Sequence, residues 1–186
     1  MTHPRTTPHQ RLGTAVCLAA LVLLGGCASL SEEQCRLADW RRIGTDDGAH
    51  GHAESRLAEH AEACAKIGIR PDAAQWRAGW DQGVWMYCTP QVGWREGLAG
   101  QGYQGVCRGR NEAAFVQAYE AGREIHRLQS RIDSAHREQQ HLQRQLREAP
   151  NDKARQQLRE RLRSLDWELS HLRRSLGLAE LQSPRY

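Results

Sequence analysis

The sequence predicts an all-α protein in which a small, disulfide-clamped helical domain is followed by a long helix and an antiparallel coiled-coil hairpin. Three observations support this fold class. No stretch alternates apolar and polar residues as a half-buried strand would. Four cysteines lie in a segment that is rich in glycine and tryptophan. Leucines near the end of the chain recur at spacings of three and four residues, which is the pattern of a helical seam.

Residues 1–26 are predicted to be a lipoprotein signal peptide. A basic start is followed by an unbroken apolar run of ten residues, from Ala15 to Leu24. This run is too short to span a bilayer, which needs about 20 residues, and is typical of an export signal. The tetrapeptide Leu-Gly-Gly-Cys that ends at Cys27 resembles a bacterial lipobox, so the Cys27 thiol is expected to carry lipid, palmitate included. An ordinary signal peptide with an incidental cysteine is the alternative.

Cleavage before Cys27 would leave residues 27–31 as a lipidated N-terminus and tether. Acyl chains hold a protein on a membrane because each buried methylene contributes about 0.8 kcal/mol. Ala28 follows Cys27, where an aspartate would be expected in a lipoprotein kept at the inner membrane. By analogy with other bacterial lipoproteins, we expect a lipid-anchored protein on the periplasmic face of the outer membrane.

The rest of the chain changes composition near Gly122. Up to that residue the expected mature chain has 10 lysines and arginines against 13 aspartates and glutamates, whereas residues 123–186 have 14 against 9. Five of the six tryptophans lie in the first part. We therefore predict a Gly/Trp-rich helical domain at 32–122, small enough that hydrophobic burial alone is marginal.

The domain's four cysteines are predicted to form two disulfides, because an even number of cysteines in an oxidising compartment is typical of a disulfide framework. Of the three possible pairings we favour Cys35 with Cys64 and Cys88 with Cys107, since each bond then closes its own local segment. Each loop should contribute about 3 kcal/mol in the chain-entropy model. The glycine-rich stretch between Cys88 and Cys107 is then a clamped loop.

Metal binding is the alternative role for these cysteines. His60 and Cys64 stand four residues apart, and His50 and His52 lie nearby with Asp46 and Asp47. Thiols in the periplasm tend to oxidise, however, and no CxxC occurs in the domain. We interpret the histidines as solvated surface side chains and predict neither a metal ligand nor a cofactor.

Glycine follows an aromatic residue after three or four positions at several places in the domain. Pro71 and Asp72 are good helix-start residues. On the helix that follows, Gly79, Gly83 and Met86 lie beside an aromatic face that we expect to pack in the core: Trp76, Trp80, Val84 and Tyr87. Trp85 projects from the opposite face of this helix, where it is a candidate for stacking on a sugar or a partner.

Three segments together have a distinctive pattern: SEEQCRLADWRRIGTDDGAHG, HAEACAKIGIRPDAAQWRAGWDQGVWMYCTPQVGWREGLAGQGYQGVC and AAFVQAYEAGREI. They include all four cysteines of the domain. Through these segments, over roughly Ser31 to Ile125, the chain resembles a family of Gram-negative lipoproteins catalogued as domain of unknown function 2799. The resemblance implies a periplasm-facing lipoprotein and implies no activity, because none is known for the family.

No catalytic arrangement is recognisable in the sequence. Nothing places two of the candidate carboxylates across a cleft, and Asp46-Asp47 before Gly48 is interpreted as a surface helix end or turn. A disulfide-bonded cysteine cannot act as a nucleophile. We therefore predict no catalytic residue, while noting the acids that an envelope hydrolase would have to use: Asp46, Asp47, Asp72, Asp81 and Glu96.

Residues 123–177 are predicted to form the coiled-coil hairpin. Apolar residues from Ile125 to Leu146 and from Leu158 to Leu176 follow heptad spacing, with Pro150 as the breaker between them. Gly177 is expected to end the second helix, which leaves 178–186 as a tail. One continuous kinked helix that dimerises is the alternative. The arginines alternate with glutamate and glutamine and are interpreted as a solvated face.

These observations favour a non-enzymatic envelope protein with a structural or adaptor role and a protein partner at the hairpin. A peptidoglycan-binding or other carbohydrate-binding module that uses Trp85 is the rival, and an envelope hydrolase is the third candidate. The export signal argues against a nucleic-acid partner.

Overall fold

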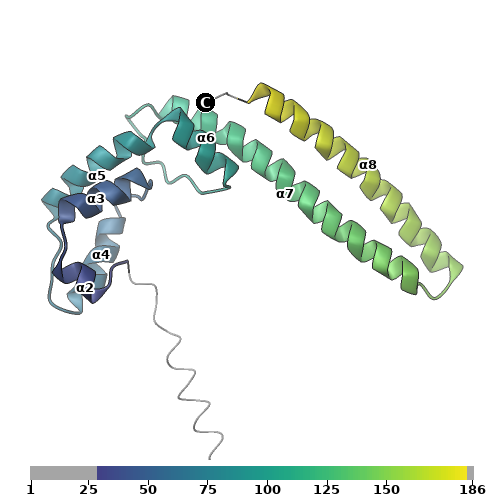
Figure 1. Ribbon diagram of the computed structural model, residues 1–186, viewed down its shortest axis with the longest axis horizontal. Helices are drawn as coiled ribbons and strands as arrows, with labels where there is room; N and C mark the ends of the chain where they lie inside the picture. The colour runs from purple at the N-terminus through teal and green to yellow at the C-terminus, as the bar shows by residue number, and fades with distance from the viewer. Residues whose placement is uncertain (1–28, 184–186) are drawn as a thin grey trace, which may run out of the picture. The chain divides into compact units, whose positions relative to one another are not determined.

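The computed structural model describes residues 29–183 and is helical, with no strand among them, as the sequence predicts (Figure 1). Cys27 and the predicted signal peptide lie outside the described residues. The helices, in chain order, are α2 (Glu32–Arg36), α3 (Trp40–Ala49), α4 (Arg56–Ala65), α5 (Ala73–Tyr87), α6 (Pro90–Leu98), α7 (Glu112–Glu148) and α8 (Asp152–Gln182).

Two compact units share the described chain. The small unit comprises residues 29–38 and 55–72, with helices α2 and α4, and the large unit comprises residues 39–54 and 73–183. The segment expected as one domain, 32–122, therefore contributes to both units.

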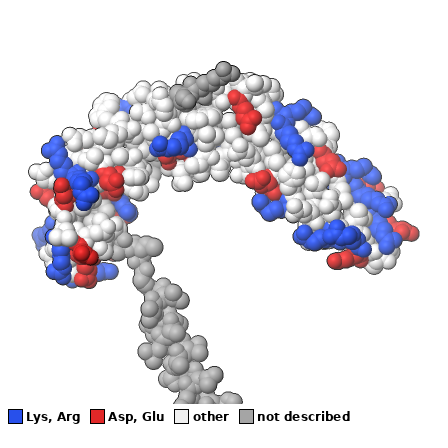
Figure 2. All heavy atoms as spheres, in the orientation of Figure 1, with Lys and Arg blue, Asp and Glu red and all other residues white. Residues whose placement is uncertain are grey.

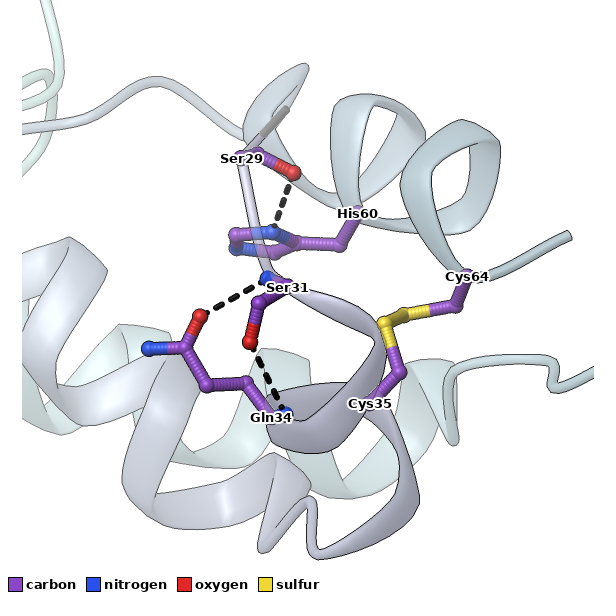
Figure 3. Close-up of a disulfide and its surroundings, with 6 residues drawn as sticks. All are labelled: Ser29, Ser31, Gln34, Cys35, His60 and Cys64. Carbon is purple, nitrogen blue, oxygen red and sulfur yellow. Dashed lines mark hydrogen bonds between the residues drawn. A yellow bond between two sulfur atoms is a disulfide. The ribbon is translucent and has the colours of Figure 1, made fainter. Parts of the chain in front are cut away.

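The small unit is held together by the disulfide between Cys35 and Cys64 (Figure 3). Ser31 caps α2: its hydroxyl accepts a hydrogen bond from the Gln34 backbone N–H, and the Gln34 side chain accepts one from the Ser31 N–H. His60 is not the solvated histidine that the sequence suggested. It is 1% exposed, and its Nδ1 lies 2.8 Å from the Ser29 hydroxyl.

In the large unit, α3 and α5 approach so closely that their glycines face the partner backbone. A β-carbon on Gly44 would lie 2.0 Å from the Trp76 carbonyl oxygen, and one on Gly79 would lie 1.9 Å from the Arg41 carbonyl oxygen. Gly48 and Gly83 repeat this reciprocal contact one turn further along. Small residues four apart allow such an approach. The predicted aromatic face of α5 is buried, but Met86, expected beside the glycines, is 62% exposed.

The stretch between Cys88 and Cys107 was predicted to be a clamped loop. The structure instead contains helix α6 within it. The disulfide joins the two cysteines, Thr89 caps the helix by accepting a hydrogen bond from the Val92 N–H, and Pro90 occupies the first turn. Its glycines are then used for packing. A β-carbon on Gly97 would lie 2.2 Å from the Tyr119 carbonyl oxygen of α7.

The α6–α7 pair repeats the α3–α5 pair. Gly48 and Gly97 lie 49 positions apart, Gly83 and Gly122 lie 39 positions apart, and each glycine faces the carbonyl three residues before its partner glycine. The loops match as well. The Trp80 indole donates a hydrogen bond to the carbonyl of residue 52 in one pair, and the Tyr119 hydroxyl donates one to the carbonyl of residue 101 in the other. The large unit therefore contains two copies of one helix-pair motif.

Helices α7 and α8 form the antiparallel hairpin (Figure 1). Asn151 caps α8 through a 2.9 Å hydrogen bond from the Ala154 N–H. The expected end of α8 at Gly177 is wrong: the helix continues to Gln182, because a single glycine costs a helix only about 1 kcal/mol. The hairpin core joins both predicted seams and consists of Ala135, Leu142, Leu165 and Leu169, with Ile132, Leu158 and Leu162 packed against them.

Candidate functional site

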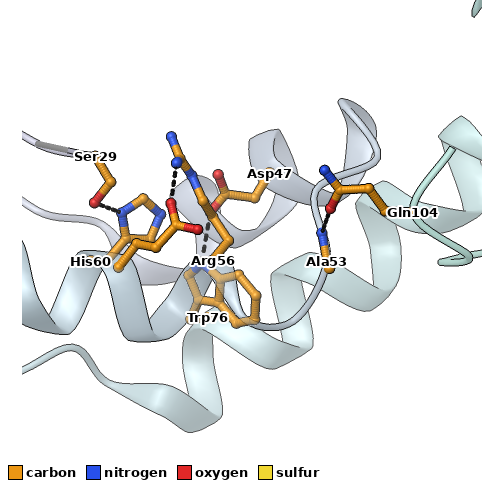
Figure 4. A network of polar contacts seen from close by, with 8 residues as sticks. Ser29, Asp47, Ala53, Arg56, His60, Trp76 and Gln104 are labelled. Carbon is orange, nitrogen blue, oxygen red and sulfur yellow. Dashed lines mark hydrogen bonds and ion pairs between the residues drawn. The ribbon is translucent and has the colours of Figure 1, made fainter. Parts of the chain in front are cut away.

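The candidate acids of the large unit do not converge on one site. Asp47 is buried and accepts a 2.8 Å hydrogen bond from the Trp76 indole, so it is not the surface residue that the sequence suggested (Figure 4). Asp81 pairs with Arg110 from the segment before α7. Among residues 29–183, Asp47 is the one acidic residue that is buried. The described acids therefore form no buried, facing carboxylate pair.

The histidines near the predicted disulfides are distributed over both units. In the large unit, His50 Nδ1 lies 2.8 Å from the Asp46 carbonyl oxygen, and the His50 and His52 rings are 6.5 Å apart. His60 belongs to the small unit and contacts Ser29. Within residues 29–183 no group of three or more histidines, cysteines or acids is arranged to hold a metal ion.

A cluster of aromatic side chains fills the space between α6, α7 and the segment that joins them. The Tyr103 ring lies 4.9 Å from the Phe115 ring, and the Tyr87 ring lies 5.1 Å from it on another side. The Tyr103 hydroxyl accepts a hydrogen bond from the Cys107 N–H and donates one to Glu112. Burial, reinforced by Glu96, raises the pKa of Tyr87 to about 12. Burial likewise raises the pKa of Tyr103.

This aromatic cluster was missed in the sequence, because Tyr103 stands in a glycine-rich segment without periodicity. Its hydrogen bonds fix the segment that leads into α7. Ala53 N–H also donates a 2.9 Å hydrogen bond to the Gln104 side chain, so the loop after α3 is fastened to the same segment (Figure 4). The cluster is thus part of the framework that positions α7.

Two aromatic side chains are exposed in the large unit. Trp85 on α5 is 60% exposed, as predicted, and Met86 beside it is 62% exposed. Trp167 on α8 is 70% exposed and was not singled out in the sequence, although it stands outside the three–four leucine spacing.

Two hollows lie along one side of the hairpin between α7 and α8, and together they are called the valley. Its first hollow is lined by Ser130 and Ser134 of α7 and by Leu165 of α8. Its second hollow, near the turn, is lined by Gln145 and has an apolar floor. The ion pair between Glu138 and Arg161, at 2.7 Å, lies where the two hollows meet, since one residue lines each. The floor of the second hollow includes Leu142 and Leu158.

Polar pairs hold the two helices together on both sides of the seam. Arg131 and Glu168 pair at 3.3 Å along the first hollow. On the other side of the seam, the Gln139 side chain donates a 2.7 Å hydrogen bond to Asp166. Such exposed pairs contribute little stability each, but they fix the register of the helices. The valley is therefore an extended surface with a defined geometry.

The comparisons with known proteins include a match to a family model over part of the chain. Residues 39–124 match a family described as "Protein of unknown function (DUF2799)". No curated protein matches the chain, and no solved structure matches it. The matched segment covers α3 to α6 and the first part of α7. None of the helices between residues 29 and 183 combines the length and the apolar character needed to cross a membrane.

Proposed function

Residues 39–124 match the model of the DUF2799 family, a family of unknown function, and from that premise we propose that the chain is a non-enzymatic envelope protein with a structural or adaptor role. The proposal is that the valley of the hairpin receives a helix of another envelope protein. It is expected to act at the periplasmic face of the outer membrane, where the predicted lipid on Cys27 would anchor it.

The continuity of α7 carries this proposal. The helix begins at Glu112 and ends at Glu148, and its first part packs on α6 through Gly122 while its second part forms the hairpin core. At 1.5 Å per residue it is about 55 Å long. Two helix pairs, one of them closed by the Cys88–Cys107 bond, thus support one uninterrupted helix. Because α7 is continuous, the helix pairs hold the valley of the hairpin in a fixed position, as an adaptor protein would require.

The valley has the features that a docking helix would need. Ser130 and Ser134 stand four residues apart on α7, so a third helix could approach its backbone closely. In the second hollow the half-buried Ala154 and Leu158 provide apolar surface. Four of the charged residues that line the hollows pair across the hairpin, Arg131 with Glu168 and Arg161 with Glu138, so an approaching helix would meet little net charge from them. A helix with an apolar stripe and small polar flanks fits this surface best.

Photo-crosslinking in cells tests the adaptor role. A photoreactive amino acid at Ser134 or Gln145 should give a discrete adduct with another protein, because both positions line the valley. The matched control is Gln143, which is exposed on α7 but lines neither hollow. Equal adduct patterns from all three positions would contradict a docking site in the valley.

The proposed anchor has a separate test. Cys27→Ser should leave an unprocessed precursor that incorporates no labelled fatty acid, and the wild-type chain should fractionate with the outer membrane. Normal processing of the variant at the same bond would refute lipidation, while leaving the adaptor role to be judged by the crosslinks.

Carbohydrate binding is a second candidate, which the exposure of Trp85 favours. An indole that is 60% exposed next to an exposed Met86 is available to stack on a sugar ring. Trp85→Ala should then abolish sedimentation with purified peptidoglycan, while Trp167→Ala, on the hairpin, should not. Unchanged sedimentation of the Trp85 variant would eliminate this candidate.

A further inference from the structure

The outer face of α8 combines exposed cations with exposed apolar side chains. Trp167 is 70% exposed, Leu178 59% and Leu181 82%, whereas Leu165, Leu169 and Leu172 of the seam on the same helix are buried. Residues three and four apart share one face of a helix, so these side chains form a single stripe opposite the seam. The residues of this outer face are Arg159, Arg163, Trp167, Ser170, His171, Arg174, Leu178 and Leu181.

The arginines of α8 fall into two groups. Those beside the seam are used within the hairpin: Arg161 pairs with Glu138, and the Arg173 guanidinium lies 3.1 Å from His136. Among the described residues, the arginines of the outer face enter no ion pair, and all are exposed: Arg159, Arg163 and Arg174. Figure 2 shows cationic side chains over the hairpin, with acidic side chains among them.

This separation implies an anionic partner for the outer face. One acid, Glu160, lies on the same face three residues before Arg163, and its side chain accepts a hydrogen bond from Gln156. The charge of Arg161 is offset by Glu138, whereas within residues 29–183 the outer-face arginines have no acidic partner. Within residues 123–186, which hold 14 cations and 9 acids, the outer face of α8 therefore presents three of the cations that enter no ion pair in the described chain.

We propose that the outer face of α8 lies on an anionic phospholipid surface. Guanidinium groups bind phosphate, and cations within reach of an anionic membrane add affinity by simple attraction. Cations alone would suit any polyanion. The exposed indole of Trp167 distinguishes the partner, because tryptophan favours the boundary between headgroups and acyl chains. Leu178 and Leu181 can enter the same boundary, as in other helices that lie in the membrane interface.

The geometry of α8 suits a helix that lies flat on such a surface. From Arg159 to Leu181 the stripe runs for about 33 Å, long enough to meet several headgroups. The outer face and the valley lie on different sides of the hairpin, so a protein docked in the valley would leave the outer face free. The inference therefore goes beyond the proposed adaptor role and does not depend on it.

Nitroxide labels on the full-length protein test the proposal. One label is placed at Ser170→Cys, on the outer face, and the matched control at Gln143→Cys on α7, where both native side chains are exposed. The four cysteines of the described chain are in disulfides, so they do not compete for the label. Mass spectrometry verifies a single label. The protein is reconstituted in vesicles of phosphatidylethanolamine with phosphatidylglycerol, or of phosphatidylcholine alone.

The readout is a ratio of two collision rates of the label. The first is its collision rate with oxygen, which concentrates in lipid, and the second is its collision rate with a water-soluble nickel chelate. With phosphatidylglycerol the ratio at residue 170 should rise several-fold above that at residue 143, and in phosphatidylcholine the two should agree. The double substitution Arg163→Gln and Arg174→Gln should lower the rise in this ratio at residue 170. Each lost arginine should weaken the affinity for phosphatidylglycerol vesicles by about fivefold. Arg155→Gln, which removes a cation that pairs with Asp152, should not.

Two results would overturn the proposal. Equal ratios at both labels in both kinds of vesicle would mean that the outer face stays in water. Spin–spin broadening at residue 170 would mean that a second copy of this chain covers the face. Neither result would alter the crosslinks from Ser134, so failure of the membrane contact and failure of the adaptor role can be told apart.

Discussion

The α-carbon of Gly97 faces the carbonyl oxygen of Tyr119 so closely that a β-carbon on the glycine would lie 2.2 Å from that oxygen. The neighbouring atoms are all backbone, so a side chain there could be accommodated only by moving α6 away from α7. Overpacking of this kind typically costs 1–3 kcal/mol, and rigid backbone places Gly97 at the upper end. We expect Gly97→Ala to lower the free energy of unfolding by about 3 kcal/mol, measured by chemical denaturation.

Gly177 is the matched control for this prediction. It also lies inside a helix, but nothing comes within 4 Å of the β-carbon it would gain. Gly177→Ala should therefore raise stability by about 0.5–1 kcal/mol, because alanine loses less conformational entropy on entering a helix. Similar effects of the two substitutions would argue that the close contact between α6 and α7 does not hold in solution.

The internal repeat predicts a specific role for the Trp76 indole. Trp76 and Phe115 lie 39 positions apart, occupy equivalent places in the two helix pairs and are each fully buried. Only Trp76 donates a hydrogen bond, to the buried carboxylate of Asp47. Trp76→Phe should therefore cost about 1–3 kcal/mol of unfolding free energy, because Asp47 loses one donor inside the protein.

A second substitution separates the hydrogen bond from packing. With Asp47→Asn already present, Trp76→Phe should cost less than it does alone, since a neutral amide loses less when a donor is removed. Equal costs in the two backgrounds, measured as a double-mutant cycle, would assign the whole effect to the smaller ring.

The raised pKa of Tyr87 predicts loss of stability at alkaline pH. Its folded-state pKa of about 12 lies above the ordinary value of 10.0, chiefly because the phenol is buried. Below pH 10 both states keep the proton, and the full contribution to stability is present. As pH rises from 10 towards 12, the unfolded chain releases the proton first, so the free energy of unfolding falls. Tyr103 shifts in the same direction.

Urea unfolding at a series of pH values measures this loss, and Tyr87→Phe should make the decline above pH 10 shallower. The variant has no proton to release at this position, so its slope should reflect the remaining groups. Identical slopes for the variant and the wild type would show that Tyr87 titrates normally in the folded protein.

Sequence patterns anticipated the parts of the fold in which local periodicity and packing agree. The buried face of α5 and the two leucine seams follow from spacing alone, and the local pairing of cysteines is the one that the structure contains. Helix α6 was missed because Gly93 and Gly97 lower its intrinsic helix propensity by about 1 kcal/mol each. The contact of those glycines with α7 compensates, and that contact is not visible in a nine-residue window.

The polar framework was anticipated less well, because its partners are far apart in the sequence. The sequence predicted Asp47 to be a surface residue. In the structure it is buried and accepts a hydrogen bond from the indole of Trp76, which lies 29 residues away. In the sequence, the arginines of the hairpin were all interpreted as part of one solvated face. Only the folded hairpin separates those that reach Glu138 or His136 on α7 from those that remain unpaired on the outer face of α8.

The continuity of α7 leads to a prediction about how the hairpin unfolds. Leu165 is 1% exposed at the centre of the hairpin core, and Leu165→Ala should destabilise that core by about 2–5 kcal/mol. The first part of α7 does not depend on this core, because Phe115 and Gly122 pack against α6. In the variant, the backbone amides of residues 128–176 should therefore lose protection from hydrogen exchange, while those of residues 115–122 keep theirs.

Leu181→Ala is the control. Its position is 82% exposed, so the substitution should leave protection in both segments unchanged. Uniform loss of protection along α7 would instead mean that the hairpin and the helix pairs unfold as one cooperative unit, and that the displayed surface is only as stable as the whole.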